Sequence, residues 1–143
     1  SFTAAIAEFR RILGQDSVLV TAEQLAPYIK TMMPVPDADH TPSAALLATT
    51  VEQIQKIVGI CNTYKVPIWM ISTGRNFGYG SAAPAERGQV VLDLKRMNRI
   101  LEVDPDLCFA LVEPGITYTV NVFTWVSVVP ESLLLVGTTT FTP

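Results

Sequence analysis

Charged side chains are scarce in this sequence. Asp, Glu, Lys and Arg make up 16% of its 143 residues, and hydrophobic residues make up 49%, whereas an average soluble domain carries roughly 25% charged residues. A domain of this length that folds alone normally covers its surface with more Lys and Glu. We therefore expect part of the surface to be covered by a partner, a cofactor or further polypeptide, with simple compactness as the alternative explanation.

Clusters of positive charge are also missing. The formal net charge is −3 and the pI is about 5.0, and the Lys and Arg residues are scattered along the chain. Proteins that bind nucleic acid concentrate such residues in order to neutralise phosphates. The sequence therefore excludes nucleic acid as a partner.

Residues that bind metals or form disulfides are few. The two cysteines, Cys61 and Cys108, lie far apart without a C-x-x-C motif or a nearby pair of histidines, so neither a metal site nor a disulfide framework is indicated. We expect two buried free thiols. His40 is the only histidine, and we expect it at the surface because it lies in the proline-rich stretch 34–42.

Long hydrophobic runs are absent as well. The most apolar tract, 120–136, is interrupted by Asn121, Pro130 and Glu131, which favours a buried segment over a membrane span. The first residues show no basic region followed by an apolar core, so no signal peptide is visible. We expect no membrane association, and the compartment stays open between cytoplasm and periplasm.

The clearest predicted elements are a helix over 50–64 and a strand over 68–71. Thr50 and Gln53 form a capping-box pattern, and Ile68-Trp69-Met70-Ile71 is a continuous apolar run typical of a strand covered on both faces. An apolar stripe on the helix is predicted from the spacing of Val51, Ile54, Val58, Cys61 and Tyr64.

Weaker patterns predict the remaining elements. A first helix capped by Ser1 and ended by Gly14 is followed by a short strand at 18–20 and a short helix opened by Thr21 and Gln24. Further strands are predicted over 43–48, 90–94, 100–103 and 109–113, with a hairpin turn at Asp104-Pro105-Asp106.

A glycine-rich segment follows the apolar run directly, with the sequence Ser72-Thr73-Gly74-Arg75-Asn76-Phe77-Gly78-Tyr79-Gly80-Ser81-Ala82-Ala83-Pro84. Its glycines allow tight turns whose N–H groups can bind an anion such as a pyrophosphate. The spacing matches neither G-x-G-x-x-G before a helix nor a Walker loop. From the residues alone, a phosphate site and a glycine-rich hairpin loop without a ligand both stay open.

The combination of motifs resembles the vanillyl-alcohol oxidase/p-cresol methylhydroxylase family of flavoproteins over residues 1–118. The resemblance rests on the order and spacing of Ser43-Ala44-Ala45, Thr50-Val51-Glu52-Gln53, Pro67-Ile68-Trp69, the glycine-rich segment, Val91-Leu92-Asp93-Leu94, Met97-Asn98-Arg99-Ile100 and Val112-Glu113-Pro114-Gly115. It implies an α+β fold, namely the N-terminal part of an FAD-binding domain.

The resemblance also implies roles for individual residues. The cofactor-binding residues around the FAD pyrophosphate are expected to be Ser72, Thr73, Gly74, Arg75, Asn76, Phe77, Gly78, Gly80, Ser81 and Pro84. Tyr79 matches the family's tyrosine that binds the phenolic oxygen of the substrate. The family passes a hydride from a 4-alkylphenol to FAD, and water then adds to the quinone methide. No acid, base, nucleophile or metal ligand is assigned in this chain.

Residues 119–143 depart from the family, because they are rich in Val and Thr and contain Glu131 as the only charged residue. The family's flavin attachment, the rest of its phenol site and its cap domain match nothing up to residue 143, so we expect the chain alone to be inactive. Two functions remain open. The chain is either a portion of an FAD-dependent oxidoreductase or a non-catalytic short relative that serves as partner or regulatory subunit of a phenol-oxidising flavoprotein. Its expected partners are a full-length flavoprotein subunit or a second copy, and a cytochrome c subunit is implied by the resemblance.

Overall fold

The protein is built around a four-stranded sheet with the strand order β1-β2-β4-β3. The computed structural model describes residues 1–31, 34–74, 81–107 and 109–117. The strands are β1 (Val18–Leu19), β2 (Ala44–Leu47), β3 (Ile68–Ile71) and β4 (Val90–Asp93). Strand β4 runs parallel to both β2 and β3, while β1 is antiparallel to β2. The predicted α+β fold is confirmed, with a parallel core of three strands.

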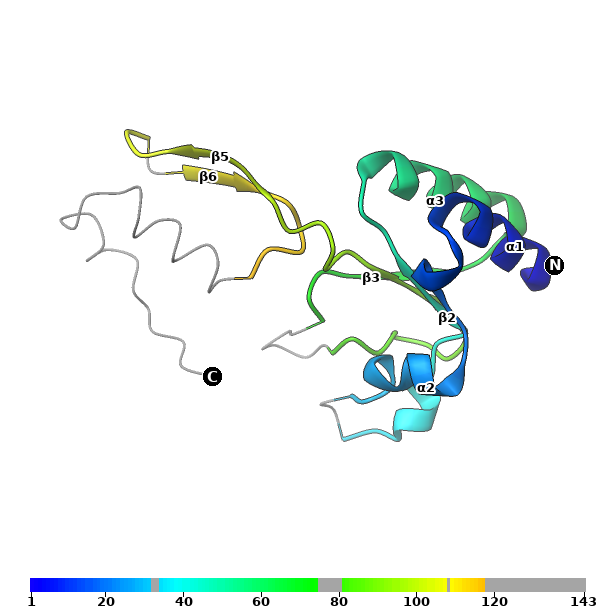
Figure 1. The fold of residues 1–143 in the computed structure, drawn as a ribbon. Coiled ribbons are helices and arrows are strands. Elements are labelled where there is room, and N and C mark those ends of the chain that lie inside the picture. Colours follow the sequence, from blue (N-terminus) through cyan, green and yellow to red (C-terminus); the bar gives the residue numbers. More distant parts are fainter. Residues whose placement is uncertain (32–33, 75–80, 108, 118–143) are drawn as a thin grey trace.

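Helices cover both faces of this sheet (Figure 1). Helices α1 (Phe2–Leu13) and α3 (Val51–Tyr64) lie on one face, and α2 (Ala22–Leu25) lies on the other with the 3-10 helix Ala26–Tyr28. Because side chains alternate along a strand, successive residues of β2 and β4 enter two separate cores. Those on the α1/α3 side are Ala44, Leu46, Val90 and Leu92, and those on the α2 side include Ala45 and Val91.

Helix α1 ends as predicted but begins without its expected cap bond. Gly14 follows the last turn with φ 85°, and its N–H donates to the Arg10 carbonyl. Ser1 occupies the N-cap position, yet its side chain makes no capping hydrogen bond. The helix therefore depends on packing, since Ala5 and Phe9 are fully buried against the sheet.

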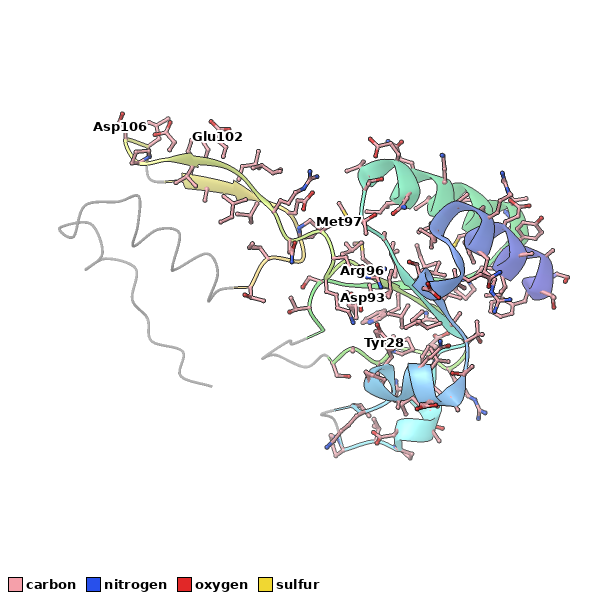
Figure 2. The ribbon with its side chains drawn as sticks, viewed as in Figure 1. Tyr28, Asp93, Arg96, Met97, Glu102 and Asp106 are labelled. Carbon is pink, nitrogen blue, oxygen red and sulfur yellow. The ribbon has the colours of Figure 1, made fainter. Side chains whose placement is uncertain are left out.

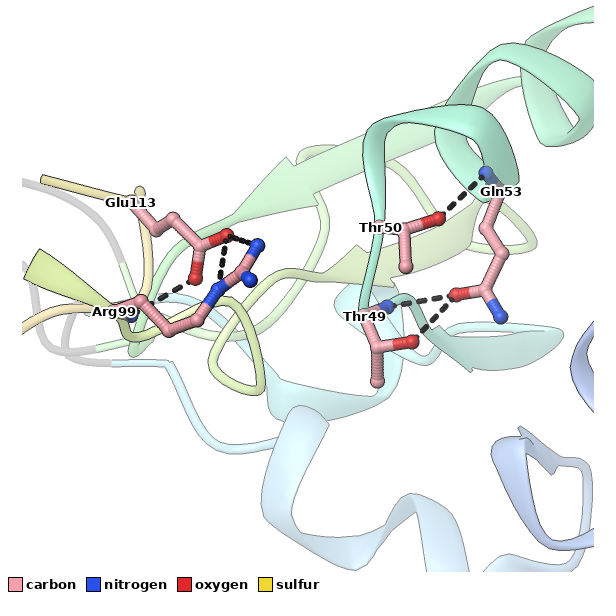
Figure 3. A network of polar contacts seen from close by, with 5 residues as sticks. All are labelled: Thr49, Thr50, Gln53, Arg99 and Glu113. Atoms are coloured by element: carbon pink, nitrogen blue, oxygen red, sulfur yellow. Dashed lines mark hydrogen bonds and ion pairs between the residues drawn. The ribbon is translucent and has the colours of Figure 1, made fainter. Parts of the chain in front are cut away.

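Helix α3 begins at the predicted residue, although only one of the two hydrogen bonds of the predicted capping box forms. The Thr50 hydroxyl accepts from the Gln53 N–H at 3.3 Å, as expected. The Gln53 side chain reaches past the cap, and its Oε1 accepts from the N–H and the hydroxyl of Thr49 at 2.8 and 2.9 Å (Figure 3). The complete box occurs instead at α2, between Thr21 and Gln24.

The predicted apolar stripe of α3 is also corrected by the structure. Ile57, Ile60 and Cys61 are buried, with Ile54 and Tyr64 packed beside them, whereas Val51 is 55% and Val58 39% exposed. Apolar residues occupy nearly half of the helix circumference. A stripe centred on Ile57, Ile60 and Cys61 therefore satisfies the 3.6-residue period as well as the predicted stripe does. Packing against the sheet selects one side of this broad arc. Cys61 is a free buried thiol as predicted, and Cys108 lies outside the described residues.

The expectation that strand β3 is covered on both faces is wrong. Met70 is 63% exposed, Ile68 and Trp69 are only partly buried, and Ile71 alone is buried. Within the described part of the chain β3 is an edge strand, because β4 lies between it and β2. An apolar run of four residues does not distinguish an edge strand from a central one.

A predicted hairpin is confirmed beyond the sheet, formed by β5 (Ile100–Asp104) and β6 (Phe109–Val112). The Asp104 carboxylate closes its turn by accepting from the N–H groups of Asp106 and Leu107 at 2.9 and 2.8 Å. The hairpin extends away from the four-stranded sheet, as the labelled Glu102 and Asp106 show (Figure 2).

Candidate functional site

The glycine-rich segment leaves the sheet at the carboxyl end of β3 and returns as β4. These two strands are neighbours, they are parallel, and Ile71 pairs with Asp93. A hairpin joins only antiparallel strands, so the segment 72–89 is a crossover connection and the hairpin-loop interpretation is wrong. Ligands of parallel sheets bind outside the carboxyl ends of the strands, and the segment begins at that edge.

The two ends of this segment approach each other at a narrow neck. Gly74 has φ +73°, and a Cβ built on it would lie 3.0 Å from the Cβ of Ala82. A side chain at residue 74 would therefore meet both a strained backbone conformation and its neighbour across the neck. The Ser81 hydroxyl accepts from the N–H of Ala83 at 3.1 Å and stabilises the returning turn. The positive φ and the close approach of Ala82 therefore both favour glycine at residue 74.

The predicted cofactor-binding residues divide between described and undescribed parts of the chain. Ser72, Thr73 and Gly74 lie at the outgoing end of the segment, while Ser81 and Pro84 lie at the returning end. The remaining predicted site residues are Arg75, Asn76, Phe77, Gly78, Tyr79 and Gly80, which lie outside the described residues. The structure brings the two ends together at the neck and leaves the roles of all these residues as predictions.

A buried carboxylate that sequence reasoning missed lies beside the outgoing end. Asp93 ends β4 and is 1% exposed. Its Oδ2 accepts from the Tyr28 hydroxyl at 2.6 Å and pairs with the Lys95 ammonium at 2.9 Å, and its Oδ1 accepts from the Lys95 N–H at 2.9 Å. Tyr28 and Asp93 are labelled in Figure 2. The sequence signal for Asp93 is a lone acidic residue at the end of an apolar strand, whereas nothing near Tyr28 in the sequence indicates the contact.

Proton affinities in this trio favour its hydrogen-bonded form. Burial, followed by the bond to Asp93, raises the pKa of Tyr28, so the phenol remains a donor. Burial lowers the pKa of Lys95, but the bonds to Asp93 and Tyr28 outweigh burial and raise it overall. The neutral phenol and the ammonium together satisfy the buried carboxylate.

A second turn packs against the end of β4. Gly115 donates its N–H to the Met97 carbonyl at 2.7 Å, and a Cβ built on Gly115 would lie 2.4 Å from the Leu94 carbonyl oxygen. Glu113 anchors this turn by binding the Arg99 guanidinium at 2.6 and 3.0 Å and the Arg99 N–H at 2.8 Å (Figure 3). Those bonds lower the pKa of Glu113.

His40 contacts the returning end of the glycine-rich segment, which the sequence did not indicate. Its Nδ1 lies 2.8 Å from the Pro84 carbonyl oxygen, and the residue is partly buried. Within the proline-rich stretch, residues Asp37–His40 form a 3-10 helix. His40 is thus partly exposed and also contacts the glycine-rich segment.

The described residues contain no cluster of His, Cys, Asp or Glu that could hold a metal ion. Among the same residues, no helix is long and apolar enough to cross a membrane. The site instead offers backbone groups beside a glycine neck, short hydroxyl side chains and the carboxyl edge of a parallel sheet. These features fit the phosphate part of a dinucleotide.

Comparison with known proteins agrees with this fit. Residues 42–122 match the FAD binding domain family, and the chain belongs to this family. It is 64% identical over 117 residues to the 4-cresol dehydrogenase [hydroxylating] flavoprotein subunit of Pseudomonas putida, covering 82% of this chain and 22% of that relative. The chain is the FAD-binding region of a flavoprotein similar to p-cresol methylhydroxylase, and FAD is its cofactor.

Solved structures show the same relationship. A crystal structure of p-cresol methylhydroxylase with substrate bound superposes with a TM-score of 0.85 and 60% identity, over 88% of this chain and 24% of the other. The 4-ethylphenol oxidase from Gulosibacter chungangensis, in complex with isoeugenol, gives a TM-score of 0.83 and 35% identity over the same shares. The chain thus spans about a quarter of the length of these relatives.

Proposed function

We propose that the glycine-rich segment holds the FAD pyrophosphate through the residues predicted above, at the carboxyl edge of the parallel sheet. The observation that carries this proposal is the position of the segment, which leaves β3 at the carboxyl edge of the parallel sheet and closes at the neck between Gly74 and Ala82. Arg75 supplies the positive charge of the segment, and Ser72, Thr73, Asn76 and Ser81 supply short polar side chains.

We propose further that the substrate is a 4-alkylphenol. The names of two similar proteins, a 4-cresol dehydrogenase and a 4-ethylphenol oxidase, support this class. FAD, when bound, accepts a hydride from the benzylic carbon. Tyr79 is proposed to bind the phenolic oxygen and favour its ionised form, so that ring electrons promote hydride loss. Water then adds to the resulting quinone methide, giving a benzylic alcohol and restoring the phenol.

This activity is proposed for the enzyme of which such a domain forms part, and residues 1–143 alone are proposed to be inactive. They span only about a quarter of the relatives' length. We assign 1–118 to the FAD-binding region and 119–143 to a divergent tail. A cytochrome c subunit as electron acceptor is proposed from the family resemblance, and the name of the P. putida relative, a flavoprotein subunit, supports a multi-subunit enzyme.

Titration of the purified chain with FAD tests the proposed cofactor site, with quenching of flavin fluorescence as the signal. Arg75→Ala is expected to weaken binding about tenfold, because a charge-assisted hydrogen bond contributes roughly 1.5–3 kcal/mol. Arg11→Ala serves as the matched control, since it removes an exposed arginine of α1. Equal loss in the two variants, or no binding by the unsubstituted chain, contradicts the proposal.

A further inference from the structure

The carbonyl of Pro84 needs a hydrogen-bond donor. The Pro84 side chain is fully buried, and buried carbonyl groups are almost always paired. His40 Nδ1 lies 2.8 Å from this oxygen. Because a carbonyl only accepts, Nδ1 carries the proton and donates it. The bond joins residues that are 44 positions apart in the chain.

The surrounding backbone holds His40 in place against the returning end of the glycine-rich segment. Gly88 donates its N–H to the Thr41 carbonyl at 2.9 Å, and Ser43 donates to the Gln89 carbonyl at 3.0 Å. On the other side, the Asp37 carboxylate accepts from the N–H of Thr31 at 3.0 Å. The 3-10 helix Asp37–His40 is thus anchored at both ends, and His40 adds a side-chain bond to these backbone contacts.

We propose that His40 is a positioning residue for the FAD pyrophosphate site, an inference that rests on the proposed function. Pro84 follows Ala82 and Ala83 directly, and Ala82 forms the neck with Gly74. Fixing the Pro84 carbonyl therefore fixes the returning side of the neck relative to the sheet. His40 itself touches no cofactor in this scheme and acts only through Pro84.

Two substitutions distinguish loss of this hydrogen bond from loss of the imidazole ring. In His40→Asn, the amide nitrogen is joined to Cβ through one carbon, as Nδ1 is in histidine, so the donor is retained at the same reach. In His40→Gln, the amide nitrogen corresponds to Nε2 and no donor faces Pro84. We expect His40→Gln to raise the dissociation constant for FAD about tenfold, and His40→Asn to stay within about twofold of the unsubstituted chain.

Amide hydrogen exchange provides a measurement that does not depend on FAD. The peptide covering 81–89 is compared with a peptide from α3 in the same sample, and the ratio of their exchange rates is recorded. His40→Gln is expected to raise this ratio about tenfold, and His40→Asn is expected to restore it. Global destabilisation speeds exchange in α3 at least as much as in the peptide 81–89, so it does not raise this ratio.

Each outcome distinguishes the two proposals. A raised ratio and weaker FAD binding in His40→Gln, with both restored in His40→Asn, support the inference. An unchanged ratio in His40→Gln overturns it, and so does a raised ratio with undiminished FAD affinity. Absence of FAD binding by the unsubstituted chain rejects the proposed function, while the exchange ratio still shows whether His40 holds the segment.

Discussion

The hydroxyl of Tyr28 donates a 2.6 Å hydrogen bond to the carboxylate of Asp93, a residue 65 positions further along the chain. This contact joins the segment on the α2 side of the sheet to the end of β4. The glycine-rich crossover begins at the end of the neighbouring strand β3, since Ile71 pairs with Asp93. Lys95 completes the trio by binding both groups, at 2.9 Å from Asp93 Oδ2 and 3.2 Å from the Tyr28 oxygen. The carboxyl edge of the sheet is therefore reinforced by a polar network around the buried Asp93 carboxylate.

Loss of the Tyr28 hydroxyl is expected to destabilise the fold. Tyr28→Phe leaves the buried Asp93 carboxylate with Lys95 as its remaining partner, so the free energy of unfolding should fall by about 1–3 kcal/mol. Tyr64→Phe is the matched control, because it removes a bond of equal length to Glu8 in a more exposed position. Urea denaturation measures both variants, and a Tyr28→Phe loss no larger than that of Tyr64→Phe refutes a reinforcing role.

The neck at Gly74 yields a prediction about cofactor binding. Gly74→Ala forces a side chain into a left-handed backbone conformation 3.0 Å from Ala82 Cβ, and such strain costs about 1–3 kcal/mol. We expect weaker FAD binding in a fluorescence titration, together with lower stability.

Gly59→Ala in α3 is the appropriate control for that substitution. Apart from its chain neighbours and the backbone of its own helix, no atom lies within 4 Å of a Cβ built on Gly59, and alanine favours helix over glycine by about 1 kcal/mol. This variant should be slightly more stable than the unsubstituted chain and should bind FAD equally well. Similar FAD affinities for Gly74→Ala and Gly59→Ala are inconsistent with a tight neck.

The Arg99–Glu113 pair predicts a pH dependence at the base of the hairpin. The hydrogen bonds from Arg99 lower the pKa of Glu113 below its ordinary value of 4.5. The stabilisation is complete above that ordinary value and is lost as the pH falls through the lower folded-state pKa.

Hydrogen exchange in β5 and β6 provides the measurement for this pair. It should accelerate below about pH 4.5, once intrinsic exchange rates are corrected for pH. In Glu113→Gln the acceleration should be absent, because an amide does not titrate in this range. A Glu113→Gln protein with the same pH profile as the unsubstituted chain argues against the assignment.

The exposed apolar side chains of the hairpin support self-association. Leu101, Leu107, Phe109 and Leu111 are 53%, 72%, 39% and 52% exposed, and an isolated two-stranded sheet is marginally stable. We expect the purified chain to pair with a second copy through this hairpin at tens of micromolar, as measured by light scattering. Leu111→Lys should give monomers, whereas Met70→Lys on β3 should not. If the chain is a monomer both with and without residues 119–143, pairing through the hairpin is ruled out.

Features that depend on neighbours in the chain were predictable from the sequence. The hairpin follows from Asp104, Pro105 and Asp106 between two apolar runs, and the start of α3 follows from a threonine that caps its own helix. The string of motifs around the glycine-rich segment links this segment to FAD through the family resemblance. Turn chemistry and periodicity act over a few residues, so the sequence alone determined these elements.

Features that depend on strand order and long-range contacts were decided by the tertiary structure. Insertion of β4 between β2 and β3 placed β3 at the edge of the sheet formed by the described residues, and it makes the glycine-rich segment a crossover. Packing on the sheet selected Ile57 and Ile60 from the broad apolar arc of α3. The bonds from Tyr28 to Asp93 and from His40 to Pro84 join positions 65 and 44 residues apart. Local sequence does not specify these bonds, because a buried acceptor is paired with a donor that only the folded chain brings within reach.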